Sequence, residues 1–451
     1  MMVEVMTETD TYLANFELLE RKLAGNSPPW INRIRKAAIS RFSERGFPTT
    51  RDEEWKFTSV APLLRIPFRP VGGYEVDGLT SSQLRRFTFG ELDCIRLVFV
   101  NGRFSDELSS VRPMPSGTKV GSIAAALDSH REWMEPHLAS NSGCQDHPFV
   151  ALNTAFLEDG AFVYLPAGKV VEQPIHLLFV STSPEEATVS HPRNLIVVGD
   201  NSQVAIVESY VGLDEGVYFT NAVTQIVAGR NAVIDHYKLQ QESREAFHIA
   251  TLAVHQDRSS NFTSHSISLG GALVRNDVNA RLDAEGAECT LNGLYMAAGQ
   301  QLIDNHTRID HAKPHCASHE FYKGILDGNA RGVFNGKIYV HPDAQKTDAK
   351  QTNKTLLLSP AATINTKPQL EIFADDVKCT HGATVGQLDE DAIFYLRSRG
   401  IGQKDARSLL TYAFANDIVS RIKIPPIRAY VEEALLAGRK LSEVQEVGEA
   451  L

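Results

Sequence analysis

Apolar residues near the start of the chain recur every three or four positions, which is the spacing of one face of an α-helix. Two such stripes lie between residues 10 and 47, separated by the helix-breaking sequence GNSPP at residues 25–29. The first contains Tyr12, Phe16, Leu19 and Leu23, and the second contains Ile31, Ile34, Ala38 and Phe42. Because the second stripe stops at Gly46 and Pro48, the pattern predicts two helices, followed by a mixed stretch with the short apolar run 95–100.

The pattern changes completely between about residues 149 and 387. Short apolar or alternating runs separated by Gly, Asn and Asp lie at residues 162–165, 195–198, 204–207, 223–227 and 233–234. The sequence Gly199-Asp200-Asn201 also returns thirty residues later as Gly229-Arg230-Asn231, and an alternating run follows each copy. Such a period predicts stacked rungs that bury their apolar faces against one another, as in a parallel β-helix. A β-sandwich is the alternative that this pattern leaves open.

Helical patterns return after Asp389. The acidic residues 389–391, together with Arg397 and Arg399, complement the dipole of a first helix that stops at Gly400. Apolar stripes then predict a second helix over 406–418 and a third over 427–438. These helices could shield the last rung of the β-helix, or they could form a docking surface, and the pattern is compatible with both roles.

The predicted fold is therefore mainly β, with a parallel β-helix between helical ends. We expect an N-terminal helical and mixed region over residues 1–148, a β-helix core over 149–388 and a C-terminal helical region over 389–451. A hydrophobic content of 43% and a charged content of 22% are typical of a soluble globular protein with a large core.

The charge of the chain argues against several classes of partner. A net charge of −10 opposes binding to nucleic acid or to anionic lipid, because both would need a basic face. The longest apolar runs fall short of the roughly 20 residues that a membrane span requires. Residues 1–10 include acidic side chains and no apolar segment of the kind found in secretory signals. These features predict a cytoplasmic protein.

The cysteines are scattered along the chain and form no C-x-x-C pair, so they encode neither a zinc knuckle nor a complete cluster site. The five cysteines are Cys94, Cys144, Cys289, Cys316 and Cys379.

The sharpest candidate for chemistry is the segment KCTHG at residues 378–382, because residues two apart on a strand face the same side. Cys379 and His381 would then present a thiol and an imidazole, ligands that suit iron or zinc. Two ligands do not complete a site, and a buried thiol beside a hydrogen-bonded histidine is the structural alternative.

A second segment is rich in histidine and suggests a metal store. It contains His306, Asp310, His311, His315, Cys316 and His319. Pro314 breaks any helix that would align the last three histidines, whereas in a strand they share one face and Cys316 points the other way. We favour a ladder of polar residues in the β-helix over a metal site.

Enzyme motifs find little support in the sequence. Residues 332–338 (GVFNGKI) faintly resemble a phosphate loop, but the glycine spacing is one residue short and Ile338 stands where Ser or Thr must bind magnesium. We therefore expect no ATP bound by this chain. A carbohydrate-active β-helix enzyme is a rival interpretation, and it would require secretion and clustered carboxylates on one face.

Several longer segments resemble the SufD family of iron–sulfur cluster assembly proteins. They are residues 51–58 (RDEEWKFT), 151–155, 173–175, 322–324, 331–334, 344–349, 367–372, 375–386 and 394–400. They follow the order of the family over about residues 45–420. Cys316 stands where no family cysteine is expected, so we treat it as incidental.

This resemblance implies a right-handed parallel β-helix and a non-catalytic scaffold. Members of the family pair with the related SufB subunit, and each of the two binds one copy of the ATPase SufC. The partners expected are thus a SufB-like subunit and a SufC-like ATPase, with a homodimer as the pairing of the isolated chain. Residues 389–438 match the part of the family that docks SufC. His381 matches the interface histidine of the family and Cys379 is its companion, so a nascent iron–sulfur cluster is expected at the interface with SufB. A SufB-type subunit is the nearest alternative, although the segment CTHGAT at 379–384 and the modest length favour SufD.

Overall fold

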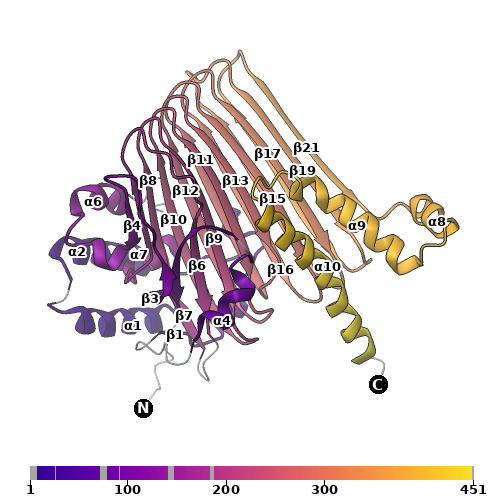
Figure 1. Ribbon diagram of the computed structural model, residues 1–451, viewed down its shortest axis with the longest axis horizontal. Helices are drawn as coiled ribbons and strands as arrows, with labels where there is room; N and C mark the ends of the chain where they lie inside the picture. The colour runs from indigo at the N-terminus through magenta and orange to yellow at the C-terminus, as the bar shows by residue number, and fades with distance from the viewer. Residues whose placement is uncertain are drawn as a thin grey trace.

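Parallel strands form two large sheets that face each other, with helices at both ends of the chain (Figure 1). The structure is a computed structural model, and it describes residues 8–25, 27–71, 79–90, 92–140, 147–182 and 187–448. Sheet A contains, in spatial order, β4 (Lys119–Ser122), β5 (Ala161–Leu165), β8 (Arg193–Val198), β10 (Tyr218–Ala228), β12 (Phe247–Gln256), β14 (Leu273–Leu282), β16 (Leu302–His311), β18 (Arg331–Val340) and β20 (Thr363–Ile372), with the short β1 (Arg69–Pro70) and β7 (Thr188–Ser190) beside them. Sheet B contains β3 (Arg103–Ser110), β2 (Ile95–Val100), β6 (Ile175–Ser181), β9 (Gln203–Gly212), β11 (Val233–Gln241), β13 (Asn261–Ser268), β15 (Glu288–Ala297), β17 (Ala317–Leu326), β19 (Asp348–Leu357) and β21 (Lys378–Gly386).

From β8 onward, successive long strands alternate between the two sheets, and each pairs in parallel with the strand two places later. This is the connectivity of a parallel β-helix, so the predicted fold class is confirmed and a β-sandwich is excluded. Inward side chains of both sheets form one apolar core that includes Leu177, Ile206, Ile226 and Leu291. Residues 95–122 also contribute strands to these sheets, and the division of the chain into three domains stays a prediction.

The thirty-residue repeat in the sequence corresponds to the turn between rungs. Asn201 and Asn231 both have positive φ, 55° and 54°, a left-handed conformation that asparagine tolerates better than most residues. Asn231 Nδ2 donates a hydrogen bond of 2.9 Å to Asn201 Oδ1, and Arg230 pairs with Asp200 at 2.6 Å. Equivalent side chains therefore stack from one rung to the next.

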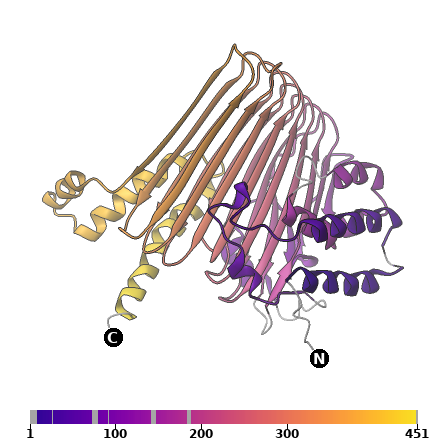
Figure 2. The same ribbon diagram turned by 180° about the vertical axis from the view of Figure 1, so that it is seen from behind.

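Helices and short turns from the N-terminal region cover much of the outer face of sheet A (Figure 2). These elements are α1 (Glu8–Leu23), α2 (Pro29–Arg45), η1 (Glu53–Trp55), α3 (Ala61–Leu64), α5 (Ile123–Ala126), α6 (Arg131–Ser140) and α7 (Pro148–Ala155). Two further short elements, α4 (Ser81–Leu84) and η2 (Arg85–Phe87), pack on the outer face of sheet B instead. The two predicted N-terminal helices are confirmed as α1 and α2. Trp30 and Ile31 of α2 pack in one cluster with Phe162 and Leu195 of sheet A.

Three helices follow the last strand: α8 (Glu390–Ser398), α9 (Gln403–Val419) and α10 (Pro425–Gly448). Asp389 caps α8 as the charge pattern predicted, because its side chain accepts a hydrogen bond of 2.9 Å from Asp391 N. The expected end of the third helix near Gly438 is wrong, since α10 continues to Gly448; one glycine inside a helix costs only about 1 kcal/mol. No helix in the described part of the chain is long and apolar enough to cross a membrane.

The C-terminal helices α9 and α10 lie across the outer face of sheet B (Figure 1). Outward-facing Ile267, Leu294 and Ile325 form an apolar stripe across the strands, and Ile418 and Val431 of the helices pack on it. The idea that these helices shield the last rung is therefore wrong, because the stripe binds them to the side of the β-helix. None of the residues that the structure describes covers the inward face of the last rung.

Candidate functional site at the open end of the β-helix

The last rung places Cys379 and His381 on the inward-facing side of β21. Their register partners on β19 are Ala349 and Gln351, which are 0% and 2% exposed and point into the β-helix. Cys379 and His381 continue these two inward files, as the strand period predicted. Because no further rung of the described chain stacks on β21, Cys379 is only half-buried and His381 is exposed.

Mostly apolar side chains surround this pair and are also left open. Register places the following residues on the same inward face: Ile364, Thr366, Pro368, Leu370 and Ile372 of β20, and Ala383 and Val385 of β21. Ile372 is 37% exposed and Val385 is 48% exposed. Both strands are also the terminal strands of their sheets, so each presents unpaired backbone groups at its edge. The end of the β-helix is thus a surface suited to another β-rich chain.

The chemistry of Cys379 fits an incomplete site. Its side chain packs with Leu370 and Val377 against a small apolar cluster that includes Ile338 and Ala349. Burial raises the pKa of the Cys379 thiol above its usual value, so the thiol is protonated at neutral pH in the free chain. A metal would have to displace this proton, which lowers the affinity of the isolated pair. Among the described residues no three His, Cys, Asp or Glu side chains converge to hold a metal ion.

The histidine-rich segment does not gather its side chains in one place. His311 is buried inside the β-helix, 2.8 Å from Ser318 Oγ, whereas His319 is exposed on the outer face. His315 lies in the turn between β16 and β17 with φ of 60°. The expectation that these three histidines share one face is wrong, because this turn interrupts the strand period. Cys316 is buried and its Sγ lies 3.3 Å from the carbonyl oxygen of Ala284.

The glycines of the segment that resembles a phosphate loop serve packing inside β18. A Cβ on Gly332 would lie 2.9 Å from Ile364 Cδ1, and a Cβ on Gly336 would lie 1.7 Å from Gln351 Nε2. Both positions face inward, where neighbouring side chains occupy the space. The segment is a strand throughout and opens no helix, so the helix N-terminus that binds phosphate is missing.

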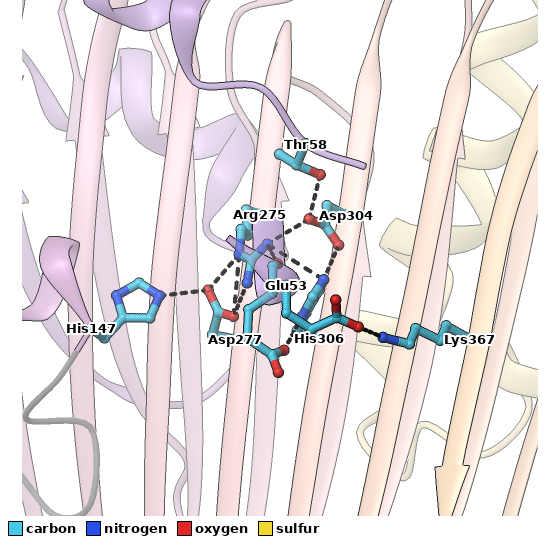
Figure 3. Close-up of polar contacts among 9 residues, drawn as sticks. Glu53, Thr58, His147, Arg275, Asp277, Asp304, His306 and Lys367 are labelled. Atoms are coloured by element: carbon cyan, nitrogen blue, oxygen red, sulfur yellow. Dashed lines mark hydrogen bonds and ion pairs between the residues drawn. The ribbon is translucent and has the colours of Figure 1, made fainter. Parts of the chain in front are cut away.

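A segment near the N-terminus, residues 51–58, crosses the outer face of sheet A toward the open end (Figure 3); we call it the strap. Buried Arg275 lies 3.8 Å from the centroid of the Trp55 ring and donates to the backbone oxygen of Glu54 at 2.7 Å. Thr58 Oγ1 donates to Asp304 at 2.6 Å. Glu53, near the start of the strap, pairs with Lys367 of β20. The strap therefore ties the N-terminal region to the last rung.

Charges beneath the strap are balanced within a buried cluster (Figure 3). Arg275 pairs with Asp277 at 2.8 Å and with Asp304 at 2.9 Å, and His306 lies 3.1 Å from Asp304. Burial opposes ionisation of these carboxyls, yet Arg275 and His147 keep the pKa of Asp277 below its usual value. His306 and Arg275 do the same for the pKa of Asp304. The sequence identified the strap as a motif but did not predict the residues that it contacts, because they come from three separate rungs.

A second exposed surface lies on the C-terminal helices. Phe394 and Tyr395 of α8 are 73% and 57% exposed, and Figure 1 shows α8 projecting away from the sheets. The nearly buried Lys323 of β17 fixes α9, because it donates to the carbonyl oxygen of Phe414 at 2.7 Å and pairs with Asp417. The base of this helical region is thus anchored while its tip presents aromatic side chains.

Comparison with known proteins gives this architecture a family. Residues 179–414 match the family described as "SUF system FeS cluster assembly, SufBD core domain", and residues 6–177 match "SufBD protein N-terminal region". The chain belongs to the SufBD family of iron–sulfur cluster assembly proteins. It is 37% identical over 409 residues to the iron–sulfur cluster assembly SufBD family protein slr0076 of Synechocystis, with 89% of each chain covered. It is 33% identical over 380 residues to the iron–sulfur cluster assembly protein SufD of Escherichia coli, with 84% of this chain and 86% of the relative covered.

More distant relatives point to the same type of subunit. The SufD protein of Bacillus subtilis is 25% identical over 412 residues, covering 89% of this chain and 92% of the relative. The chain is a SufD-type subunit of the SUF system, as the sequence motifs indicated. The SufBD family is a family of scaffold-type assembly subunits, and membership in it argues against the carbohydrate-active enzyme.

Proposed function

We propose that this chain is a cytoplasmic, non-catalytic scaffold subunit that pairs with a SufB-type subunit through its open end. The observation that carries the proposal is the uncovered inward face of β20 and β21. Leaving apolar side chains such as Val385 and Ile372 in water is unfavourable, and a second β-helix end would bury them. The edges of the two terminal strands add backbone hydrogen bonds to such a contact.

The nascent cluster is the cargo of this interface. His381 and Cys379 supply an imidazole and a thiol from one inward face, and the partner supplies the remaining ligands. Closing the interface would remove water from the site and would bring the charge of bound iron close to the thiol. That charge stabilises the thiolate, which is the form that binds a metal.

The C-terminal helices are the docking site for the SufC-type ATPase. Exposed Phe394 and Tyr395 supply aromatic contact area of the kind that anchors protein interfaces. Because α9 is fixed to β17 through Lys323, a movement of the docked ATPase would reach the sheets and their open end.

Co-purification with the SufB-type and SufC-type subunits of the same genome tests each part separately. With Val385→Asp, the amount of SufB-type subunit that co-purifies should fall at least 10-fold, because the variant places a charge in the apolar contact. The amount of ATPase should not change. The matched control is Val170→Asp, since Val170 is 53% exposed elsewhere on the surface. Retention of the SufB-type subunit by Val385→Asp would contradict the pairing.

The ATPase contact is tested in the same way. The double variant Phe394→Asp and Tyr395→Asp, or deletion after Asp389, should lose the ATPase, whereas Leu18→Asp on α1 should keep it. His381→Ala should keep both partners and lose iron and sulfide. Normal iron and sulfide content in that variant would remove His381 from the site.

A second copy of this chain is the other candidate occupant of the open end. The same uncovered face supports a homodimer when the SufB-type subunit is absent. Sedimentation of the isolated chain should then show a dimer that Val385→Asp converts to a monomer. Addition of the SufB-type subunit should replace the homodimer by the mixed pair.

A further inference from the structure

A file of polar side chains leads from the inside of the β-helix to His381. Glu320 on β17 is the register partner of Gln351 on β19, and Gln351 is the register partner of His381 on β21. Glu320 is 3% exposed and Gln351 is 2% exposed, whereas His381 lies at the open surface. The next position inward in the same file is Leu291, so the polar file begins at Glu320.

A hydrogen bond fixes one end of the Gln351 amide. Gln351 Nε2 donates to Glu320 Oε2 at 2.8 Å, which points the amide nitrogen toward the interior. The amide oxygen, Gln351 Oε1, is buried and has no hydrogen-bond partner among the residues that the structure describes. A buried acceptor without a partner is unfavourable, so a partner for this oxygen is to be expected in the working state.

Gly336 on β18 keeps room for this amide. A Cβ at position 336 would lie 1.7 Å from Gln351 Nε2 and 2.6 Å from Gln351 Cδ, well inside van der Waals contact. The backbone of Gly336 adopts ordinary strand geometry, so the absence of a side chain is the property that the site needs. The chain therefore holds Gln351 in place from two sides, by Glu320 and by Gly336.

We propose that Glu320 and Gln351 form a buried pair that positions the imidazole of His381 for the nascent cluster. Parallel strands lie about 4.8 Å apart, which places the imidazole within reach of Gln351 Oε1. An N–H of the ring donated to that oxygen would fix the tautomer and leave the other nitrogen free as a metal ligand. Glu320 acts through Gln351, so both are positioning residues. This inference rests on the proposed function of His381.

Burial of Glu320 is otherwise hard to explain by packing. Its side chain is enclosed in the β-helix, and burial raises its pKa to about 7. An apolar residue such as Leu291, its neighbour in the file, would cost the fold less at this position. A buried carboxyl group at the head of a file that ends at the candidate ligand is a feature of the site rather than of the core.

Nitrogen NMR of the full-length chain labelled with ¹⁵N-histidine tests the proposal, with the His381 signal assigned from His381→Ala. We expect one tautomer of His381 in the wild-type chain and a mixture in Gln351→Met, which keeps the volume and removes the acceptor. Glu320→Leu should also give a mixture, whereas Glu320→Gln should restore the single tautomer. In the complete complex, Gln351→Met should slow cluster assembly about 10-fold to 100-fold, as loss of outer-shell partners of metal-ligating histidines does.

Asn353→Leu is the matched control, because Asn353 is a buried amide on the same face of β19 and its register partner is Ala383. It should leave the His381 tautomer unchanged. Should Gln351→Met fail to fold, Gly336→Ala displaces the amide and should give the same mixture. An unchanged tautomer in a folded Gln351→Met or Gly336→Ala chain overturns the proposal. Normal assembly by His381→Ala, with the tautomer effects intact, would instead overturn the proposed function alone.

Discussion

The two ends of the β-helix carry a similar inward pattern of side chains but differ in how they are covered. At the first rungs, Val163 of β5 and Leu177 of β6 are 0% exposed. At the last rung, Val385 of β21 is 48% exposed. The first end is closed because β3 and β4 extend the sheets in antiparallel fashion, and Phe104, Met114 and Val120 pack onto the core.

This difference shows that closing a β-helix requires extra residues, which the chain supplies at one end only. Residues 387–451 follow β21, and the described part of them lies on the side of sheet B or projects from it. The open end therefore remains available to another chain at a cost in stability for the isolated subunit.

The largest contrast is expected from the same substitution at the two ends. Val163→Asp places an unpaired carboxylate in the closed core, so we expect loss of several kcal/mol or failure to fold. Val385→Asp should change the free energy of unfolding by no more than about 0.5 kcal/mol, because its site is already in contact with water. Urea unfolding followed by circular dichroism measures both, and equal losses would mean that the ends do not differ.

The strap ties the N-terminal region to the last rung, and Arg275 is its central contact. Arg275→Met should destabilise the chain by about 3–5 kcal/mol, because it leaves Asp277 and Asp304 buried without their cation. Glu53→Gln, which weakens only the exposed contact with Lys367, should cost less than about 1 kcal/mol. A small loss in Arg275→Met, measured by chemical unfolding, would show that the strap does not depend on this cluster.

Buried titratable groups near the two ends should make the stability of the chain depend on pH in opposite directions. Burial lowers the pKa of His176, near the closed end, to about 3, so its contribution is lost as the pH falls below about 6.5. Burial raises the pKa of Glu320 to about 7, so its contribution is lost as the pH rises from about 4.5 through 7. The free energy of unfolding of Glu320→Gln, relative to that of the wild type, should therefore rise by on the order of 2–3 kcal/mol between pH 5 and pH 8. His176→Gln should instead reduce the loss of stability below pH 6.5. If stability depended on pH in the same way in both variants, these assignments would be contradicted.

The turns between rungs offer the smallest effect. His315 adopts a left-handed φ of 60°, and glycine does so without strain, so His315→Gly should stabilise the chain by about 0.5–1 kcal/mol. Asn231→Gly, nearer the closed end, should give no gain because it removes the hydrogen bond to Asn201. Melting temperatures of the two variants and of the wild-type chain test this prediction. Destabilisation by His315→Gly would show that the imidazole has a structural partner.

Local patterns predicted the elements, and the resemblance predicted the family. The helical stripes gave α1, α2, α9 and the start of α10, the charge pattern gave α8, and the repeat of Asn201 at Asn231 indicated the rungs. The period of two also placed Cys379 and His381 on one face. These predictions succeed because each depends on residues close together in the chain.

Contacts between distant segments were beyond the reach of these patterns. The strap meets Arg275 more than two hundred residues later, and the alignment of Glu320, Gln351 and His381 depends on register between strands about thirty residues apart. Parity failed for His311, His315 and His319, because a turn resets the strand period. The packing of α9 and α10 on sheet B followed from an apolar stripe assembled from separate rungs, among them those of β13, β15 and β17.

Hydrogen–deuterium exchange of the backbone amides of β20 and β21 tests the central claim most directly. The chain is measured alone, as a monomeric Val385→Asp variant, and in complex with the SufB-type subunit. We predict that amides of residues 363–372 and 378–386 exchange markedly more slowly in the complex, while amides on the turns near Asn201 do not change. Equal exchange at the open end in the monomeric Val385→Asp variant and in the paired wild-type chain, with protection elsewhere, would contradict the account.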